Sequence, residues 1–220
     1  MDILLDTKII VIIKNIRIFD MENPDYKKIT QILNYIAEKQ GGKVDYMKAL
    51  KLLYLADRLH LRKYGRLITD DRLIAMTHGT LGSQAKDIAV KSDFLPHVVY
   101  QYVDDKLKRD SKEYTIAVNN KERDQISETD FECVDKVLSV VGNKKPFDLV
   151  KIVHELPEWK RWQYVLEEEK EKSVVDLDLS DLFKPVNDEI LGKIYSQSPE
   201  ELDLSHSFFS DSLEQKEIFA

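Results

Sequence analysis

The order of apolar and polar residues along the chain predicts mainly helices. After Asn23 and Pro24, which are typical of a helix start, apolar side chains recur every three or four positions: Ile29, Ile32, Leu33 and Ile36. Two glycines at positions 41 and 42 end this pattern. We therefore expect a first amphipathic helix over residues 25–40.

A second helix is predicted over residues 45–64, with Asp45 as its N-cap and Gly65 directly after its last turn. Its apolar residues cover most of the helix circumference: Met47, Leu50, Leu52, Leu53, Leu55, Ala56, Leu59 and Leu61. A helix that is apolar nearly all round is a buried one, so we expect this helix at the centre of the fold.

The rest of the chain favours shorter elements. Apolar and β-branched residues between turn signals predict extended segments at 71–77 and 114–118. Helices are expected at 83–91, 127–141, 146–156 and 158–172, and Ser127 with Asp130 resembles a capping box. The pattern at 94–103 is ambiguous. The predicted fold class is mainly α with a small antiparallel β element, an α+β fold.

The N-terminal residues 1–20 form a separate segment. Their apolar run, residues 9–13, lies between two lysines and is far shorter than the ~20 residues that cross a bilayer. A small-residue cleavage site is also missing, so neither a membrane span nor a signal peptide is predicted. Two interpretations stay open: an edge strand, or an extension upstream of a start at Met21.

Composition narrows the class of protein. The chain has 220 residues, 43% of them hydrophobic, which is enough for one main domain with a buried core. Its single cysteine, Cys133, excludes a disulfide framework and a zinc site built on cysteines. This composition is typical of a soluble, cytoplasmic protein.

Charge divides the chain unevenly. Residues 166–220 hold 15 acidic residues and five lysines, a net charge of -10, whereas residues 1–165 hold 28 basic and 25 acidic residues. We therefore expect a helical domain over 21–165 and an acidic C-terminal interaction segment over 166–220. Apolar pairs in that segment are candidate contacts to a surface of the chain itself or of a partner: Leu182, Phe183, Phe208 and Phe209. The alternative is a solvated extension, and the negative charge argues against nucleic acid as its partner.

No catalytic constellation is recognisable in the sequence. The five histidines lack the i, i+4 spacing of a zinc helix, and neither a Gly-rich phosphate loop nor a Gly-x-Ser-x-Gly elbow is present. We predict no catalytic residues, no cofactor, no metal and no enzymatic activity.

One group of polar residues interrupts the apolar central helix. Asp57 and His60 are three positions apart on one face, with Tyr54 three positions before Asp57. They could recognise a ligand or partner, or carry out chemistry. They could equally form a satisfied buried network that fixes the core, and that interpretation is favoured.

The sequence between 51 and 69 resembles the signature of the SocA-like antitoxin family, the Panacea domain, long known as phage-associated proteins. The resemblance extends over about residues 25–163 and includes a later His-Glu followed by Trp. The family-motif residues, structural or partner-binding, are Lys51, Leu53, Tyr54, Asp57, His60, Tyr64, Gly65, Gly79, His154 and Trp159. One departure is the turn Gly79-Thr80-Leu81-Gly82, where family members carry a Gly-Pro-Val-Pro-like sequence.

The resemblance implies an antitoxin that neutralises a co-encoded toxin by direct protein–protein binding. One relative instead delivers its toxin to a protease, so a proteolytic adaptor is the alternative. Because many toxins act on nucleic acids and carry basic surfaces, the acidic segment 166–220 is expected to steer the association with such a toxin. No membrane partner is expected.

Overall fold

The computed structural model describes residues 25–169 and 172–218, and every structural statement below concerns these residues. The predictions for residues 1–20 lie outside the described part of the chain. No helix within the described ranges is long and apolar enough to cross a membrane.

The expected central helix is confirmed as α3 (Tyr46–Tyr64), and its residues from 49 to 62 are all buried. The carboxylate of Asp45 accepts a hydrogen bond from the Lys48 backbone N–H at 2.9 Å and so caps the first turn. Gly65, with a φ of 69°, ends the helix in the left-handed conformation that glycine adopts without strain. Both ends of α3 are thus determined by local sequence.

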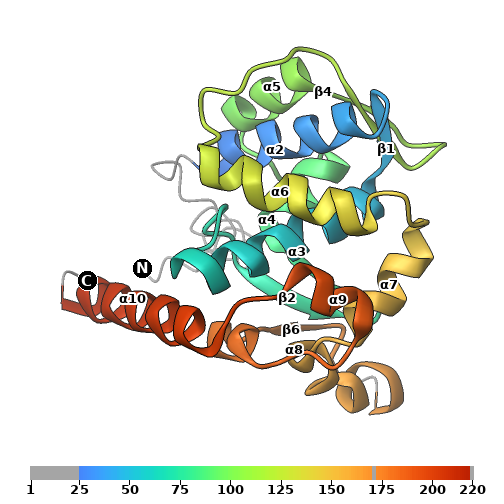
Figure 1. Ribbon diagram of the computed structural model, residues 1–220. Coiled ribbons are helices and arrows are strands. Elements are labelled where there is room, and N and C mark those ends of the chain that lie inside the picture. The colour runs from blue at the N-terminus through green and yellow to red at the C-terminus, as the bar shows by residue number, and fades with distance from the viewer. Residues whose placement is uncertain (1–24, 170–171, 219–220) are drawn as a thin grey trace, which may run out of the picture.

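Helices surround α3 on several sides, and Figure 1 shows α3 between α6 and α10. The helices that precede the C-terminal segment are α2 (Asp25–Lys39), α4 (Ser83–Val90), α5 (His97–Lys106), α6 (Glu128–Val141), α7 (Pro146–His154) and α8 (Pro157–Lys160). The capping box at Ser127 and Asp130 is present at the start of α6. The ambiguous pattern at 94–103 becomes α5, whose first residue follows Pro96.

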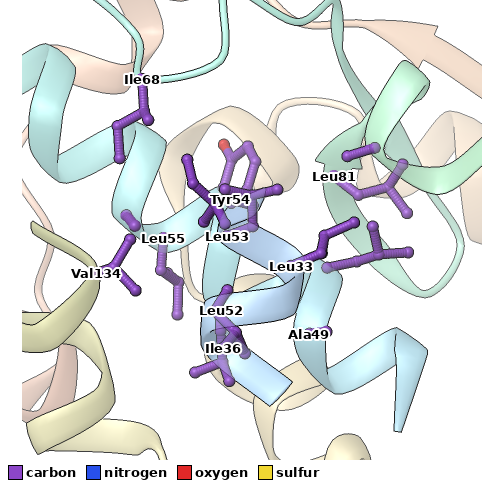
Figure 2. Close-up of a cluster of buried hydrophobic side chains, with 14 of the residues drawn as sticks. Leu33, Ile36, Ala49, Leu52, Leu53, Tyr54, Leu55, Ile68, Leu81 and Val134 are labelled. Atoms are coloured by element: carbon purple, nitrogen blue, oxygen red, sulfur yellow. The ribbon is translucent and has the colours of Figure 1, made fainter. Parts of the chain in front are cut away.

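The hydrophobic core forms where these helices meet. Figure 2 shows Leu33 of α2 close to Leu53 of α3, with Leu81 and Val134 on opposite sides of the cluster. Each of these side chains is at most 8% exposed. The apolar faces that the sequence pattern predicted for residues 25–40 and 45–64 are therefore the faces that pack together.

Two small antiparallel sheets lie at the edges of this core. The first has the order β1-β5-β4 and the second the order β3-β2-β6. Their strands are β1 (Lys43–Asp45), β4 (Leu107–Asp110), β5 (Thr115–Val118), β2 (Leu73–Met76), β3 (Gly79–Gly82) and β6 (Val174–Asp176). In the second sheet Ala75 pairs with both Thr80 and Val175. The predicted fold class, mainly α with small antiparallel β elements, is confirmed.

The single helix expected over 158–172 is wrong. The chain forms the single turn α8, then a turn, then the π-helical segment η1 (Val165–Glu169). The reason is tertiary: Trp159 and Leu166 both bury their side chains against Ala75 and Val175 of the second sheet. Residues 158–169 do not form one straight helix, because the burial of Trp159 and Leu166 in this small second core outweighs the helix propensity of the sequence.

The C-terminal segment packs on α3. After β6 it forms the 3₁₀ turn η2 (Leu179–Phe183), α9 (Glu189–Ile194) and α10 (Pro199–Ile218). Leu182, Leu191 and Ile194 are at most 1% exposed and belong to the main core. The Ser205 hydroxyl of α10 donates a hydrogen bond to the Arg62 carbonyl at 2.8 Å. This part of the chain is therefore seated on the protein's own body.

Candidate functional site

Several of the family-motif residues meet at the β2–β3 hairpin. Lys51 of α3 is 1% exposed, and its Nζ donates a hydrogen bond to the Thr80 carbonyl at 2.8 Å. Gly79 has a φ of 91°, and a Cβ at this position would lie 3.2 Å from Lys51 Nζ and 3.4 Å from His154 Cδ2. The backbone at Gly79 is thus the point where α3, the hairpin and α7 approach one another, and only glycine fits there.

His154 and Trp159 flank the Pro157 break and stack on each other. Their ring centroids are 3.6 Å apart with an interplanar angle of 8°. The Trp159 Nε1–H donates to the Met76 carbonyl at 3.0 Å, which fixes the indole against strand β2. Burial lowers the pKa of His154 below its usual value, because desolvation disfavours the charged imidazolium.

A buried ion pair completes this region, and sequence reasoning missed it. Arg58 Nε donates to Glu158 Oε1 at 2.9 Å, and both side chains are fully buried. The Tyr54 hydroxyl donates to the same carboxylate oxygen at 2.7 Å. The available signal was the spacing of Lys51, Tyr54 and Arg58 at i, i+3 and i+7, which places them on one face of the apolar helix.

We call these side chains the polar cluster: Lys51, Tyr54, Arg58, Thr80, His154 and Glu158. The Lys51 hydrogen bond joins α3 to the hairpin, and the Tyr54 and Arg58 hydrogen bonds join α3 to α8. Among the described residues, four polar atoms of the cluster have no hydrogen-bond partner: Arg58 Nη1, Thr80 Oγ1, His154 Nε2 and Glu158 Oε2. The bonds that do form fix the hairpin and α8 relative to α3.

Asp57 and His60 do not join the polar cluster. The Asp57 carboxylate accepts hydrogen bonds from the backbone N–H groups of Ile68 and Thr69, at 2.8 and 3.0 Å, and from the Thr69 hydroxyl at 2.8 Å. Asp57 therefore organises the loop that leads from α3 to β2. Its oxygens are engaged with that loop and do not face Tyr54, whose hydroxyl is bound to Glu158.

His60 is directed to the other end of the same loop. Its Nδ1 lies 2.8 Å from the Arg66 carbonyl, and its Nε2 lies 3.1 Å from the Thr129 hydroxyl of α6. Burial lowers the pKa of His60 to about 4. His60 thus connects α3, the loop and the start of α6.

The other motif residues have packing roles in the structure. Leu53 lies in the main core. The Tyr64 hydroxyl donates to Glu132 of α6 at 2.6 Å. A Cβ on Gly65 would lie 2.6 Å from the Ser205 carbonyl oxygen and 2.8 Å from Phe208 Cβ, so glycine lets α10 cross the end of α3.

The altered turn sequence forms strand β3. The last residue, Gly82, leaves room for the Asp71 carboxylate, which a Cβ at position 82 would contact. That carboxylate accepts hydrogen bonds from the backbone N–H groups of Gln84 and Ala85, at 2.9 and 2.8 Å, and so caps α4 from a distance. The absence of a side chain at Gly82 therefore lets the Asp71 carboxylate reach the N-terminus of α4.

The four predicted contacts of the acidic segment divide into inner and outer residues. Leu182 and Phe209 are buried against the protein itself, and Phe183 is partly buried beside them. Phe208 is 56% exposed. Arg62 of α3 holds this segment, because its Nη1 donates to the Leu182, Phe183 and Lys184 carbonyls at 2.6–3.1 Å.

Comparison with known proteins identifies the family. The family model described as "Antitoxin SocA-like, Panacea domain" matches residues 50–160, about half of the chain, and the protein belongs to this family. The matched range contains every residue of the polar cluster. No curated protein and no solved structure matches the chain.

Proposed function

We propose that this protein is an antitoxin that neutralises a co-encoded toxin by binding it directly. The observation that carries the proposal is the family match over residues 50–160, which includes most of α3, the β2–β3 hairpin and α8. The description of the family model names an antitoxin-like domain. The motif residues that this chain shares with the family lie at the core of its fold.

The chemistry of the polar cluster supports binding over catalysis. Lys51 is engaged with a backbone carbonyl, Arg58 and Tyr54 with Glu158, and all four side chains are buried. A catalytic group has to come within hydrogen-bond reach of the substrate atom on which it acts. Groups held in this way organise the fold, and a toxin would meet the surface that the fold presents.

Co-expression tests the proposal. The open reading frame adjacent to this gene is expressed from an inducible promoter, alone and together with this protein. We expect the adjacent product to arrest growth and this protein to restore it. The control is the same plasmid with an early stop codon in this gene. Continued arrest while this protein accumulates in soluble form would contradict the proposal.

Toxin half-life separates the two mechanisms that the family resemblance raised. Direct occlusion leaves the half-life of the adjacent product unchanged while growth recovers. A proteolytic adaptor shortens it. Pulse-chase measurement in cells with and without this protein therefore decides between occlusion and delivery to a protease.

A further inference from the structure

One face of α10 carries exposed apolar side chains between carboxylates. Glu200, Leu204, Phe208 and Asp211 follow one another at spacings of four, four and three residues, which places them on one side of a helix. Leu204 is 59% exposed and Phe208 is 56% exposed. We call these four residues the α10 strip.

The opposite face of α10 fixes the direction in which the strip points. Ser205 and Phe209 are at most 7% exposed, and Phe209 packs on Phe183 with ring centroids 5.6 Å apart. The hydrogen bond from the Ser205 hydroxyl to the Arg62 carbonyl, together with the close approach of Ser205 to Gly65, holds this face of α10 against the end of α3. The apolar side chains of the strip are therefore held outward by the fold.

The charge of α10 indicates which kind of partner surface is complementary to the α10 strip. From position 199 to position 215, α10 contains five carboxylates and no lysine or arginine: Glu200, Glu201, Asp203, Asp211 and Glu214. All five side chains are exposed, and the ion pairs of the described C-terminal residues involve other carboxylates. A surface that covers α10 gains most if it supplies the missing cations.

We infer that the α10 strip is the docking site for a basic protein surface with an apolar depression that receives Leu204 and Phe208. This inference rests on the proposed function, and it identifies the partner as the toxin. A second copy of the chain fits poorly, because antiparallel pairing of two α10 strips sets the carboxylate of Glu200 against that of Asp211, and like charges across an interface repel. Apolar anchors surrounded by complementary charge are the usual composition of a specific interface.

Two sets of substitutions test the strip. The variant Leu204→Ser/Phe208→Ser removes the apolar anchors, and Glu200→Gln/Asp211→Asn removes charge with little change of shape. Phe94→Ser is the matched control, because Phe94 is 87% exposed and lies before α5, outside the strip. Titration calorimetry against the purified product of the adjacent open reading frame measures the dissociation constant. Circular dichroism melts confirm that each variant folds.

We expect the apolar variant to raise the dissociation constant at least about tenfold and to lose rescue of growth. The charge variant slows association and flattens its dependence on salt. The control binds as the wild type does. Rescue by the wild type with undiminished binding by both strip variants overturns the inference and leaves the proposed function standing.

Two other results also overturn the inference, each in a distinguishable way. If the wild type neither binds the adjacent product nor restores growth, the proposed function fails and the inference fails with it. If sedimentation shows a dimer of the wild type that becomes a monomer in the Leu204→Ser/Phe208→Ser variant, the strip belongs to a second copy of the chain.

Discussion

Lys51 is the residue whose chemistry the fold changes most clearly. Its ammonium group is enclosed between α3 and β3, and burial lowers its pKa to about 7. The unfolded chain holds this proton up to about pH 10. Between these values the unfolded state binds more protons than the folded state, so the contribution of Lys51 to stability increases as the pH rises.

The variant Lys51→Met tests this sign. The free energy of unfolding of the wild type, minus that of the variant, is expected to rise by about 1 kcal/mol per pH unit between pH 7 and pH 9. Urea denaturation at several pH values measures the difference. Lys112→Met, in the exposed turn between β4 and β5, is the control for removing a lysine at a solvent-exposed position. A constant difference for Lys51→Met would refute the buried-amine account.

The conformation and close contacts of Gly65 lead to a second prediction about a single residue. The variant Gly65→Ala must adopt a positive φ and place a Cβ against Ser205 and Phe208 of α10. We expect it to lose about 2 kcal/mol or more of unfolding free energy. Gly41→Ala is the matched control, since φ at Gly41 is 89° and a Cβ there meets nothing within 4 Å. The difference in unfolding free energy between Gly65→Ala and Gly41→Ala measures the energetic effect of the close approach of α10 to Gly65.

At the scale of elements, the connection between α3 and α8 depends on a charge pair in the core. Breaking a buried pair leaves one charge without its partner, so Glu158→Leu or Arg58→Met alone should each cost about 3–5 kcal/mol. The double variant should cost clearly less than the sum of the two. A double-mutant cycle by chemical denaturation measures this coupling. Additive losses would mean that the two side chains act independently.

The elements that the sequence predicts are those whose signals are local. Asp45, the apolar run and Gly65 determine α3 within 21 residues, and its position at the centre follows from its composition. Strand β6 has three residues and exists because it pairs with Met76, Ala75 and Ile74, about 100 positions earlier. The sequence around residues 174–176 contains no pattern that predicts such a strand. In the same way, no pattern near residue 160 predicts the turn after α8.

The same contrast applies to the site. The family motif names Lys51, Tyr54, Gly79, His154 and Trp159, and the structure brings them together. Arg58 and Glu158 were missed because a charged pair in the core contradicts the rule that charged side chains stay in water. Asp57 and His60 are three positions apart on the helix, yet they bind different residues of the α3–β2 loop, Asp57 at Ile68 and His60 at Arg66.

For the whole molecule, the acidic C-terminal segment is a part of the core as well as a carrier of charge. Deleting residues 173–220 removes β6 from the edge of β2 and takes away Leu182, Leu191 and Ile194. We expect the truncated protein to lose cooperative thermal unfolding and to be digested rapidly by trypsin. Loss of growth rescue by that deletion would therefore report on folding, whereas the α10 strip variants test the proposed interface.

A milder truncation gives the comparison. Ending the chain after residue 210 keeps Ser205 and Phe209 on α3 and removes Asp211 and Leu213. Its melting temperature should stay within a few degrees of the wild type, because residues 211–215 are exposed or only partly buried, and such positions contribute little to stability. A collapse of the melting transition in this variant would show that the part of α10 beyond residue 210 is needed for the fold.

The position of β6 late in the sequence also determines when the second sheet can be completed during synthesis on the ribosome. Strand β2 is synthesised about 100 residues before the strand that covers its edge, and at roughly 5–20 residues per second the stretch from residue 173 onward takes about 2–10 seconds more. Until residues 182–184 are made, Arg62 lacks the carbonyl acceptors of its Nη1, and Arg58 lacks the Lys184 carbonyl that accepts from its Nη2 at 3.1 Å. A broken or stalled messenger therefore yields a chain that cannot close its core, and we expect quality-control proteases to remove it.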